Sequence, residues 1–236
     1  MDKRIFLALL VVTLAAGGVF AEVQLSAGLG GSFTADFQNY RYTSDGKDML
    51  DARGLDKDIN NMNRIGGGFF AYFDASYVMA SLGMTFYNFT PANKDEKKDW
   101  KDDNYKISDT EFNIGVYGKY PIEMGKMVLF PILGADIKLA LGRTYNADGE
   151  KSKYTDDEGE EVSPLKHLTT VYFRGGVGLD IPLGEKMYLR PIFLYGIGTK
   201  SNDQKEDEDG AWNKDPKLMS YINHGLDIKL ALGFKF

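Results

Sequence analysis

Eight segments of this chain alternate apolar and polar residues with a period of two, the pattern of a strand that has two different environments on its faces. After Ala21 the chain contains no apolar stretch of about 18 residues, so a membrane-spanning helix is not available. Most of the alternating segments are longer than the roughly 9–11 residues that a tilted strand needs to cross a bilayer. The pattern predicts an all-β protein folded as an eight-stranded antiparallel up-and-down transmembrane β-barrel. The segments are 22–37, 64–74, 76–89, 108–120, 127–143, 167–181, 187–199 and 218–236.

The connections between these segments are alternately long and short. The long ones are 38–63, 90–107, 144–166 and 200–217, and the short ones are residue 75, 121–126 and 182–186. An even number of strands therefore gathers the long loops at one end of the barrel, with the tight turns and both termini at the other. This asymmetry is typical of outer-membrane barrels, which have short periplasmic turns and longer extracellular loops.

The charged residues of the segments fall almost entirely on one phase of the alternation. A soluble eight-stranded barrel would also alternate, so alternation alone does not distinguish it from a membrane barrel. The partition of the charged residues does. An eight-stranded barrel has an interior only just wide enough for its side chains, and we expect the bulky aromatic phase to face lipid and the charged, glycine-rich phase to face the lumen. Buried charges are tolerated only when they pair, and the two signs nearly cancel here. The predicted lumen charge network is Asp36, Arg64, Asp74, Glu111, Lys119, Asp136, Lys138, Arg174, Asp180, Arg190, Asp227 and Lys229.

Arg143 is the one charged strand residue on the apolar phase. Because it lies at a loop end, we expect its long side chain to snorkel to the membrane interface.

The N-terminus has the organisation of a secretory signal peptide. Lys3 and Arg4 precede an apolar run from Ile5 to Ala16, and Val19-Phe20-Ala21 matches a small-x-small cleavage site. We therefore predict a signal peptide over 1–21, a barrel domain over 22–236, and secretion to the bacterial outer membrane. The absence of cysteine excludes a disulfide scaffold and a thiolate metal site, and the net charge of −6 argues against a nucleic-acid partner.

The last eight residues, Lys229 to Phe236, alternate and end on an aromatic residue. They resemble the C-terminal signal by which the bacterial barrel-assembly machinery recognises its substrates: Lys229, Phe234 and Phe236 match, and Ala231 departs at a position where the family has glycine. The whole mature chain resembles the small eight-stranded outer-membrane barrels around OmpA, OmpX and OmpW. The resemblance implies the fold, the outer-membrane lipid environment and the assembly machinery as a partner, and it carries almost no information on activity.

Catalytic, cofactor and metal sites are not predicted. His167 and His224 are the only histidines. His224 lies on the lipid-facing phase near the outer rim, a position similar to that of the active site of the lipid A deacylases. Such an enzyme needs a serine beside the histidine, and Leu226 occupies the place where that serine is expected. The segment from Asp203 to Gly210 superficially resembles a calcium loop but lacks the closing Glu.

The four long loops carry 23 acidic and 16 basic residues, together with aromatic residues and arginines of the kind that anchor interfaces. A surface-exposed structural or adhesive protein, which binds a host or surface ligand through these loops, is the favoured function. A narrow porin or small-solute channel of the OmpW kind is the alternative, and a lipid-modifying barrel enzyme is the third. The loop residues that we single out are Tyr40, Arg41, Tyr42, Arg53, Trp100, Tyr105, Tyr154 and Trp212.

Overall fold

The computed structural model describes residues 24–42, 62–91, 105–147, 150–153, 169–198 and 219–236, together with Lys98, Lys101, Ser163 and Leu165. The predicted signal peptide and most of the long-loop residues lie outside these ranges. The described part of the chain has no helix long and apolar enough to cross a membrane.

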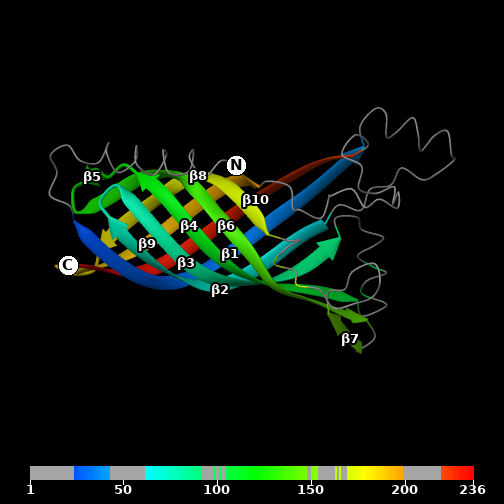
Figure 1. Cartoon of the computed structure of the whole chain (residues 1–236). Coiled ribbons are helices and arrows are strands. Elements are labelled where there is room, and N and C mark those ends of the chain that lie inside the picture. The colour runs from blue at the N-terminus through cyan, green and yellow to red at the C-terminus, as the bar shows by residue number, and fades with distance from the viewer. Residues whose placement is uncertain are drawn as a thin grey trace.

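Ten antiparallel strands form one closed sheet (Figure 1). Eight of them make the barrel wall in the order β4-β3-β2-β1-β10-β9-β8-β6, and the pairing of β4 with β6 closes it. The short strands β5 and β7 pair only with β6 and extend it at its two ends. The strands are β1 (Leu25–Tyr42), β2 (Met62–Ala75), β3 (Val78–Pro91), β4 (Lys106–Lys119), β5 (Ile122–Met124), β6 (Met127–Ala147), β7 (Glu150–Lys153), β8 (Thr170–Pro182), β9 (Met187–Gly198) and β10 (Met219–Lys235).

The first and last strands pair along their whole length, from Ser26 opposite Lys235 to Tyr42 opposite Met219. This pairing removes the sheet edges that would otherwise expose unpaired backbone groups to lipid. The predicted fold class, an eight-stranded antiparallel up-and-down barrel, is therefore confirmed.

The register fixes the size of the barrel. Starting at Leu25 and following paired residues once around the wall leads back to β1 at Ala35, ten residues further along the strand. With a rise of about 3.3 Å per residue and strands about 4.8 Å apart, this stagger gives a strand tilt of about 40° and a backbone radius of about 8 Å. The lumen therefore has room for side chains and little else.

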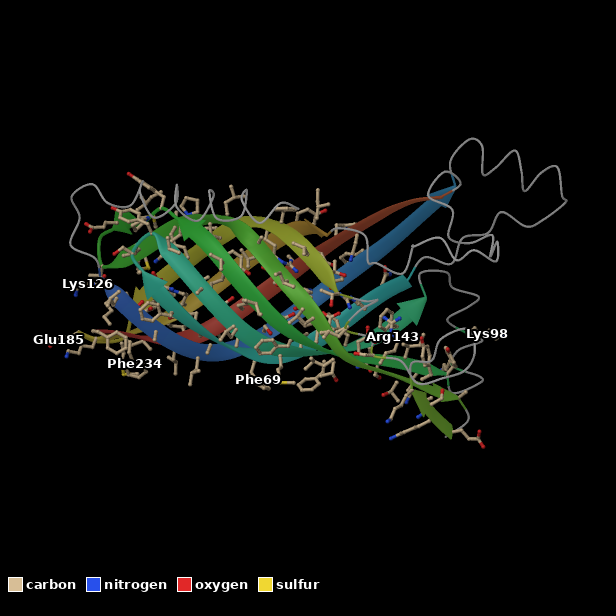
Figure 2. All side chains as sticks on the ribbon, viewed as in Figure 1. Phe69, Lys98, Lys126, Arg143, Glu185 and Phe234 are labelled. Carbon is tan, nitrogen blue, oxygen red and sulfur yellow. The ribbon has the colours of Figure 1, made fainter. Side chains whose placement is uncertain are left out.

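The outer surface carries the apolar phase of the alternation. Leu29 is 71% exposed and Leu133 73% exposed, although both are aliphatic side chains in the middle of strands. Phe69 and Phe234 project outward from the wall (Figure 2). On β2 the outward apolar residues run from Ile65 to Ala75, which corresponds to about 25 Å along the barrel axis. Such a belt matches the lipid-facing band of outer-membrane barrels and would aggregate in water.

Several boundaries differ from the predicted ones. β1 continues to Tyr42 and β6 to Ala147, so the first residues of the predicted loops 38–63 and 144–166 are strand, and β7 forms a hairpin with β6 inside the latter. The connection predicted as the single residue 75 is a two-residue turn, Ser76-Tyr77, in which Ser76 has a φ of 52°. The predicted turn 121–126 includes β5, which pairs back on β6 around Gly125 at a φ of 67°. Glycine is favoured there because the left-handed conformation strains other residues.

The prediction for Arg143 was wrong, and a β-bulge explains why. Thr110 pairs with Gly142 but the next residue, Glu111, pairs with Ala140, so Leu141 is an extra residue in β6. One extra residue moves every following side chain to the opposite face. The Arg143 guanidinium therefore turns inward, where its Nε and Nη2 donate to the two oxygens of Asp109 at 2.7 Å each.

Candidate functional site

The lumen is filled by two ion clusters separated by an aromatic and aliphatic layer. We call the one near the short turns the turn-end cluster: Asp74, Lys119, Asp180 and Arg190. We call the one near the long loops the loop-end cluster: Asp36, Arg64, Asp109, Glu111, Asp136, Lys138, Arg143, Arg174 and Asp227.

Arg190 is the centre of the turn-end cluster. Its Nε and Nη2 donate to the two carboxylate oxygens of Asp180 at 2.6 and 2.7 Å, and its Nη1 donates to Asp74. Asp74 is also 2.8 Å from the Nζ of Lys119. The bidentate geometry is the strongest form of an arginine–carboxylate pair, and it ties β9 to β8 and, across the lumen, to β2.

Aromatic rings enclose the Arg190 guanidinium. The carbon at its centre lies 4.7 Å from the ring centroid of Tyr72, 4.9 Å from that of Tyr188 and 5.0 Å from that of Phe130. The Tyr72 hydroxyl donates to the Tyr188 hydroxyl at 2.9 Å, and the latter donates to Ser26 Oγ at 2.7 Å. These rings seal the turn end of the lumen around a neutralised charge.

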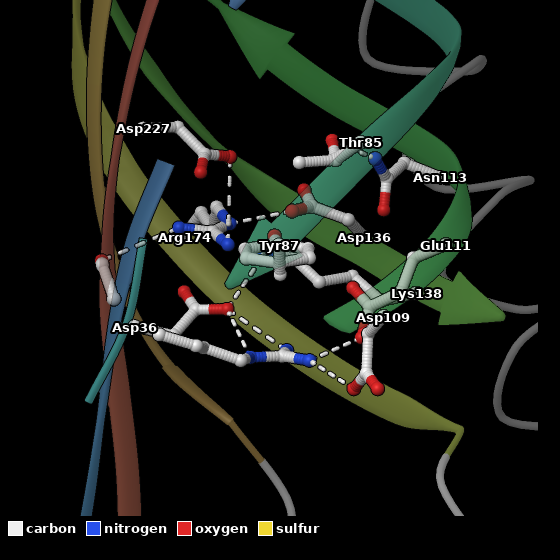
Figure 3. Close-up of polar contacts among 12 residues, drawn as sticks. Asp36, Thr85, Tyr87, Asp109, Glu111, Asn113, Asp136, Lys138, Arg174 and Asp227 are labelled. Atoms are coloured by element: carbon white, nitrogen blue, oxygen red, sulfur yellow. Dashed lines mark hydrogen bonds and ion pairs between the residues drawn. The ribbon is translucent and has the colours of Figure 1, made fainter. Parts of the chain in front are cut away.

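Arg64 and Lys138 hold one half of the loop-end cluster (Figure 3). Arg64 Nε donates to Asp36 Oδ2 at 3.0 Å, and its Nη1 pairs with Glu111 and lies 3.7 Å from Asp109. Lys138 Nζ donates to the same Asp36 oxygen at 2.9 Å and to the Tyr87 hydroxyl at 2.6 Å. Five different strands are joined through these contacts.

Arg174 holds the other half of the loop-end cluster. Its Nε donates to Asp136, its Nη2 lies 3.4 Å from Asp227 Oδ2, and its Nη1 donates to the Gly225 carbonyl at 3.3 Å. The Tyr117 hydroxyl donates to the other oxygen of Asp136. Asp136 is thus held on both of its oxygens.

Lys229 lies in the layer between the two clusters. Its Nζ is 5.3 Å from the ring centroid of Phe70 and 5.7 Å from that of Tyr117. The hydrophobic cluster of the lumen, which includes the rings around Arg190, consists of the buried side chains Phe70, Tyr72, Met79, Tyr117, Phe130, Ile132, Tyr188, Ile192, Leu194 and Ala231.

The described lumen is electrically balanced, since seven carboxylates (Asp36, Asp74, Asp109, Glu111, Asp136, Asp180 and Asp227) face seven cations (Arg64, Lys119, Lys138, Arg143, Arg174, Arg190 and Lys229). With an apolar belt outside and balanced charges inside, the wall is built for a bilayer. The fold is that of a small outer-membrane barrel.

Comparisons with known proteins find similar solved structures. No family model and no curated protein matches the sequence. Neisserial surface protein A is similar at 12% identity and a TM-score of 0.44, over 89% of this chain and 99% of that one. Ail, the attachment invasion locus protein of Yersinia pestis, solved with a heparin analogue, is similar at 12% identity and a TM-score of 0.41. The match covers 92% of this chain and 100% of that one. The outer membrane protease OmpT from Escherichia coli is similar at 9% identity and a TM-score of 0.41. The match covers 92% of this chain and 99% of that one.

The structure places all twelve residues of the predicted lumen network inside the barrel. Eleven of them have an ion-pair partner among the described residues, and Lys229 lies against rings and close enough to Asp227 for the two charges to interact. The sequence reasoning omitted Asp109 and Arg143 from the network. It assigned the aromatic residues of the apolar phase to the lipid face but made no assignment for the tyrosines of the polar phase, of which Tyr72, Tyr87, Tyr117, Tyr172 and Tyr188 are buried in the lumen.

The sequence pattern did indicate that these tyrosines point into the lumen. Tyr72, Tyr117, Tyr172 and Tyr188 each lie two residues before an inward charge, on the same phase of the alternation. Glycines on neighbouring strands make the space: a Cβ at Gly178 would overlap the ring of Phe130. Aromatic rings therefore fit inside an eight-stranded barrel because they lie over glycines of neighbouring strands, which have no side chain.

The groups considered for catalysis do not form a recognisable constellation in the described part of the chain. The His224 ring is stacked on Phe37 at 5.3 Å, and its Nδ1 lies 3.1 Å from the Tyr195 hydroxyl. His167 and the segment 203–210 lie outside the described residues. Within the described ranges, no three His, Asp or Glu side chains are grouped in a way that could hold a metal ion. Phe234 and Phe236 are exposed at the turn end, and their part in assembly stays a prediction.

Proposed function

We propose that this chain is a structural, ligand-presenting barrel of the outer membrane, which binds a partner outside the cell through its long loops. The observation that carries the proposal is the closed lumen. Fourteen charged side chains pair across it or lie against rings, and aromatic layers fill the remaining space. A barrel filled in this way can serve as a rigid support for its long loops, but it has no open channel for solutes through the lumen.

The strands that continue beyond the apolar belt favour the same function. On the outer surface the belt ends at polar residues such as Asn88, to which Ser108 donates a hydrogen bond at 3.0 Å. Ser108 pairs with Thr144 of β6, and β6 runs on to Ala147 and folds back into β7. β1 and β10 remain paired up to Tyr42 and Met219, and this ribbon projects from the same end (Figure 1). Paired backbone extends the rigid wall outward, so the loops start from a fixed platform.

The composition of the loops indicates the kind of partner. Acidic residues outnumber basic ones by 23 to 16 in the four loops, and 144–166 alone has seven acids against three lysines. A surface with a net negative charge attracts basic partners. The attraction weakens at higher ionic strength because salt screens exposed charges.

A loop-replacement experiment tests the proposal. Residues 46–58 and 154–162, which lie beyond the last described strand residues, are replaced by short Gly-Ser linkers, and the protein is folded into phosphatidylcholine vesicles. We expect the variant to keep its resistance to SDS without heating, because the paired strands are untouched, and to lose binding to immobilised extracellular-matrix proteins and to host cells. A variant with Glu123→Gln, at the opposite end of the barrel, should bind like the wild type. Unchanged binding after loop replacement would contradict an adhesive role.

Planar-bilayer recording tests the alternative, a narrow channel. The wild-type protein should give little or no conductance, because the ion pairs and rings close the lumen. A steady, large single-channel conductance would favour the channel over the adhesive barrel.

Two further parts of the proposal concern biogenesis. We propose cleavage after Ala21 and delivery to the barrel-assembly machinery through the C-terminal residues Lys229, Phe234 and Phe236. N-terminal sequencing of protein purified from outer membranes should begin at Glu22, and an intact N-terminus would contradict cleavage.

A further inference from the structure

We propose that the outer side of the wall binds the phosphate-bearing headgroup of an anionic membrane lipid, at a group of lysines just beyond the apolar belt. The group lies on β4, β6 and β7, and β7 continues the wall at the loop end of β6 (Figure 1). Its three lysines are exposed. We call it the lysine patch: Lys106, Ser108, Thr144, Asn146, Lys151 and Lys153.

The strand register puts the three lysines on one face. Lys106 of β4 pairs with Asn146 of β6, and Asn146 also pairs with Lys151 of β7. Directly opposite residues of antiparallel strands have their side chains on the same face, and Lys153 shares that face because it is two residues from Lys151. The Cα atoms of Lys106 and Lys151 are therefore about 10 Å apart, and those of Lys151 and Lys153 about 7 Å apart.

This face is the outer one, at the height of lipid headgroups. Arg143 turns inward to Asp109, so the next residue, Thr144, points outward. Thr144 pairs with Ser108, which lies at the polar end of the apolar belt. Lys106 is two residues further along β4, about 5 Å along the barrel axis. Headgroups occupy roughly 5–8 Å beyond the hydrocarbon core, so the lysines lie in that layer.

The charge of the patch is not cancelled by acids of the same wall. In the described part of the chain, the strands β3, β4, β6 and β7 have four carboxylates: Asp109, Glu111, Asp136 and Glu150. The first three are buried in the lumen, and Glu150 pairs with Ala147, on the opposite face from the lysines. Lysines grouped in this way attract anionic headgroups at a membrane surface.

The position of the patch favours a lipid over a soluble anion. The lysines face sideways from the wall, and β3 and β6 carry the exposed side chains of Phe86 and Leu141 in the adjacent part of the belt. Acyl chains can therefore lie against the belt while the headgroup meets the lysines. A phosphate accepts hydrogen bonds from ammonium groups, and the Thr144 hydroxyl and the Asn146 amide are further donors. A zwitterionic headgroup has its own cation, so the patch selects a lipid with net negative charge.

Native mass spectrometry of the detergent-solubilised protein, with phosphatidylglycerol or phosphatidylcholine added, measures the binding of the first lipid molecule. Lys106→Gln with Lys151→Gln removes two charges of the patch. Lys126→Gln with Lys186→Gln, two exposed lysines at the turn end, is the matched control. Each lysine near an anionic surface is worth about a fivefold change in binding, so the patch variant should bind phosphatidylglycerol at least about fivefold more weakly than the wild type. Phosphatidylcholine binding should not change. Undiminished phosphatidylglycerol binding, or an equal loss in the control, would overturn the proposal.

Two further measurements separate a lipid from other occupants. If the patch variant loses binding to inositol hexaphosphate but keeps its binding to phosphatidylglycerol, the patch serves a soluble polyanion and the proposal fails. Photoreactive phosphatidylglycerol in vesicles of the wild-type protein does not depend on the folding of a variant. We expect its adducts to concentrate on residues 105–110 and 144–153, and adducts spread evenly around the wall would overturn the proposal.

Discussion

Replacing Arg190 with methionine removes the guanidinium at the centre of the turn-end cluster while keeping most of the side-chain volume. Two carboxylates lose a partner, but not equally. Asp74 keeps Lys119 at 2.8 Å, whereas Asp180 loses the only ion pair that the described residues give it. The variant therefore leaves one buried carboxylate unpaired.

The expected loss of stability follows from the unpaired charge. Removing one partner of a buried ion pair typically costs about 3–5 kcal/mol, because the other charge stays buried without compensation. We therefore expect Arg190→Met to lower the free energy of unfolding by about 3–5 kcal/mol at pH 7.

Urea unfolding of the protein in phosphatidylcholine vesicles, followed by circular dichroism and by mobility on unheated gels, measures these differences. The double variant Arg190→Met with Asp180→Leu serves as the matched test. It removes both charges of the pair, and we expect it to recover at least half of the loss, since replacing a buried pair by apolar residues is often close to neutral. A loss below about 1 kcal/mol at pH 7, or a double variant less stable than Arg190→Met, would refute the view that pairing is what makes this lumen tolerable.

Three other outcomes follow from the structure. Gly178→Ala should destabilise the barrel by about 1–3 kcal/mol in the same unfolding assay, because the new Cβ overlaps the Phe130 ring, while Gly142→Ala, which has open space around it, should change little; equal effects would contradict the packing described here. Phe236→Asp should reduce the yield of folded protein in the outer membrane much more than Trp100→Asp in loop 90–107, because a charge at the apolar belt opposes insertion; similar yields for the two would count against it. Single cysteines placed within 144–166 or 200–217 should react with an impermeant maleimide on intact cells, and labelling seen only after permeabilisation would reverse the topology.

The candidate site was partly predictable from the sequence. Inward charges such as Arg174 and Asp227 were identifiable because a strand repeats every two residues, and a barrel wall converts that period into inside and outside. Which charge meets which was not predictable. Arg190 reaches Asp74 across 116 positions of the chain, and such a contact depends on the stagger of all eight strands.

The sequence by itself determined the fold class, the order of the strands and the two faces of the wall, because these depend on local alternation and on the lengths of the connections. Only the tertiary structure decided the inward direction of Arg143, since a single bulged residue, Leu141, reverses the phase and leaves no mark in the composition. It also decided that tyrosines fill the lumen, because the room for Tyr72 comes from Gly28 and Gly233 on two other strands. Periodicity is a property of one strand, whereas space and charge pairing are properties of the closed barrel.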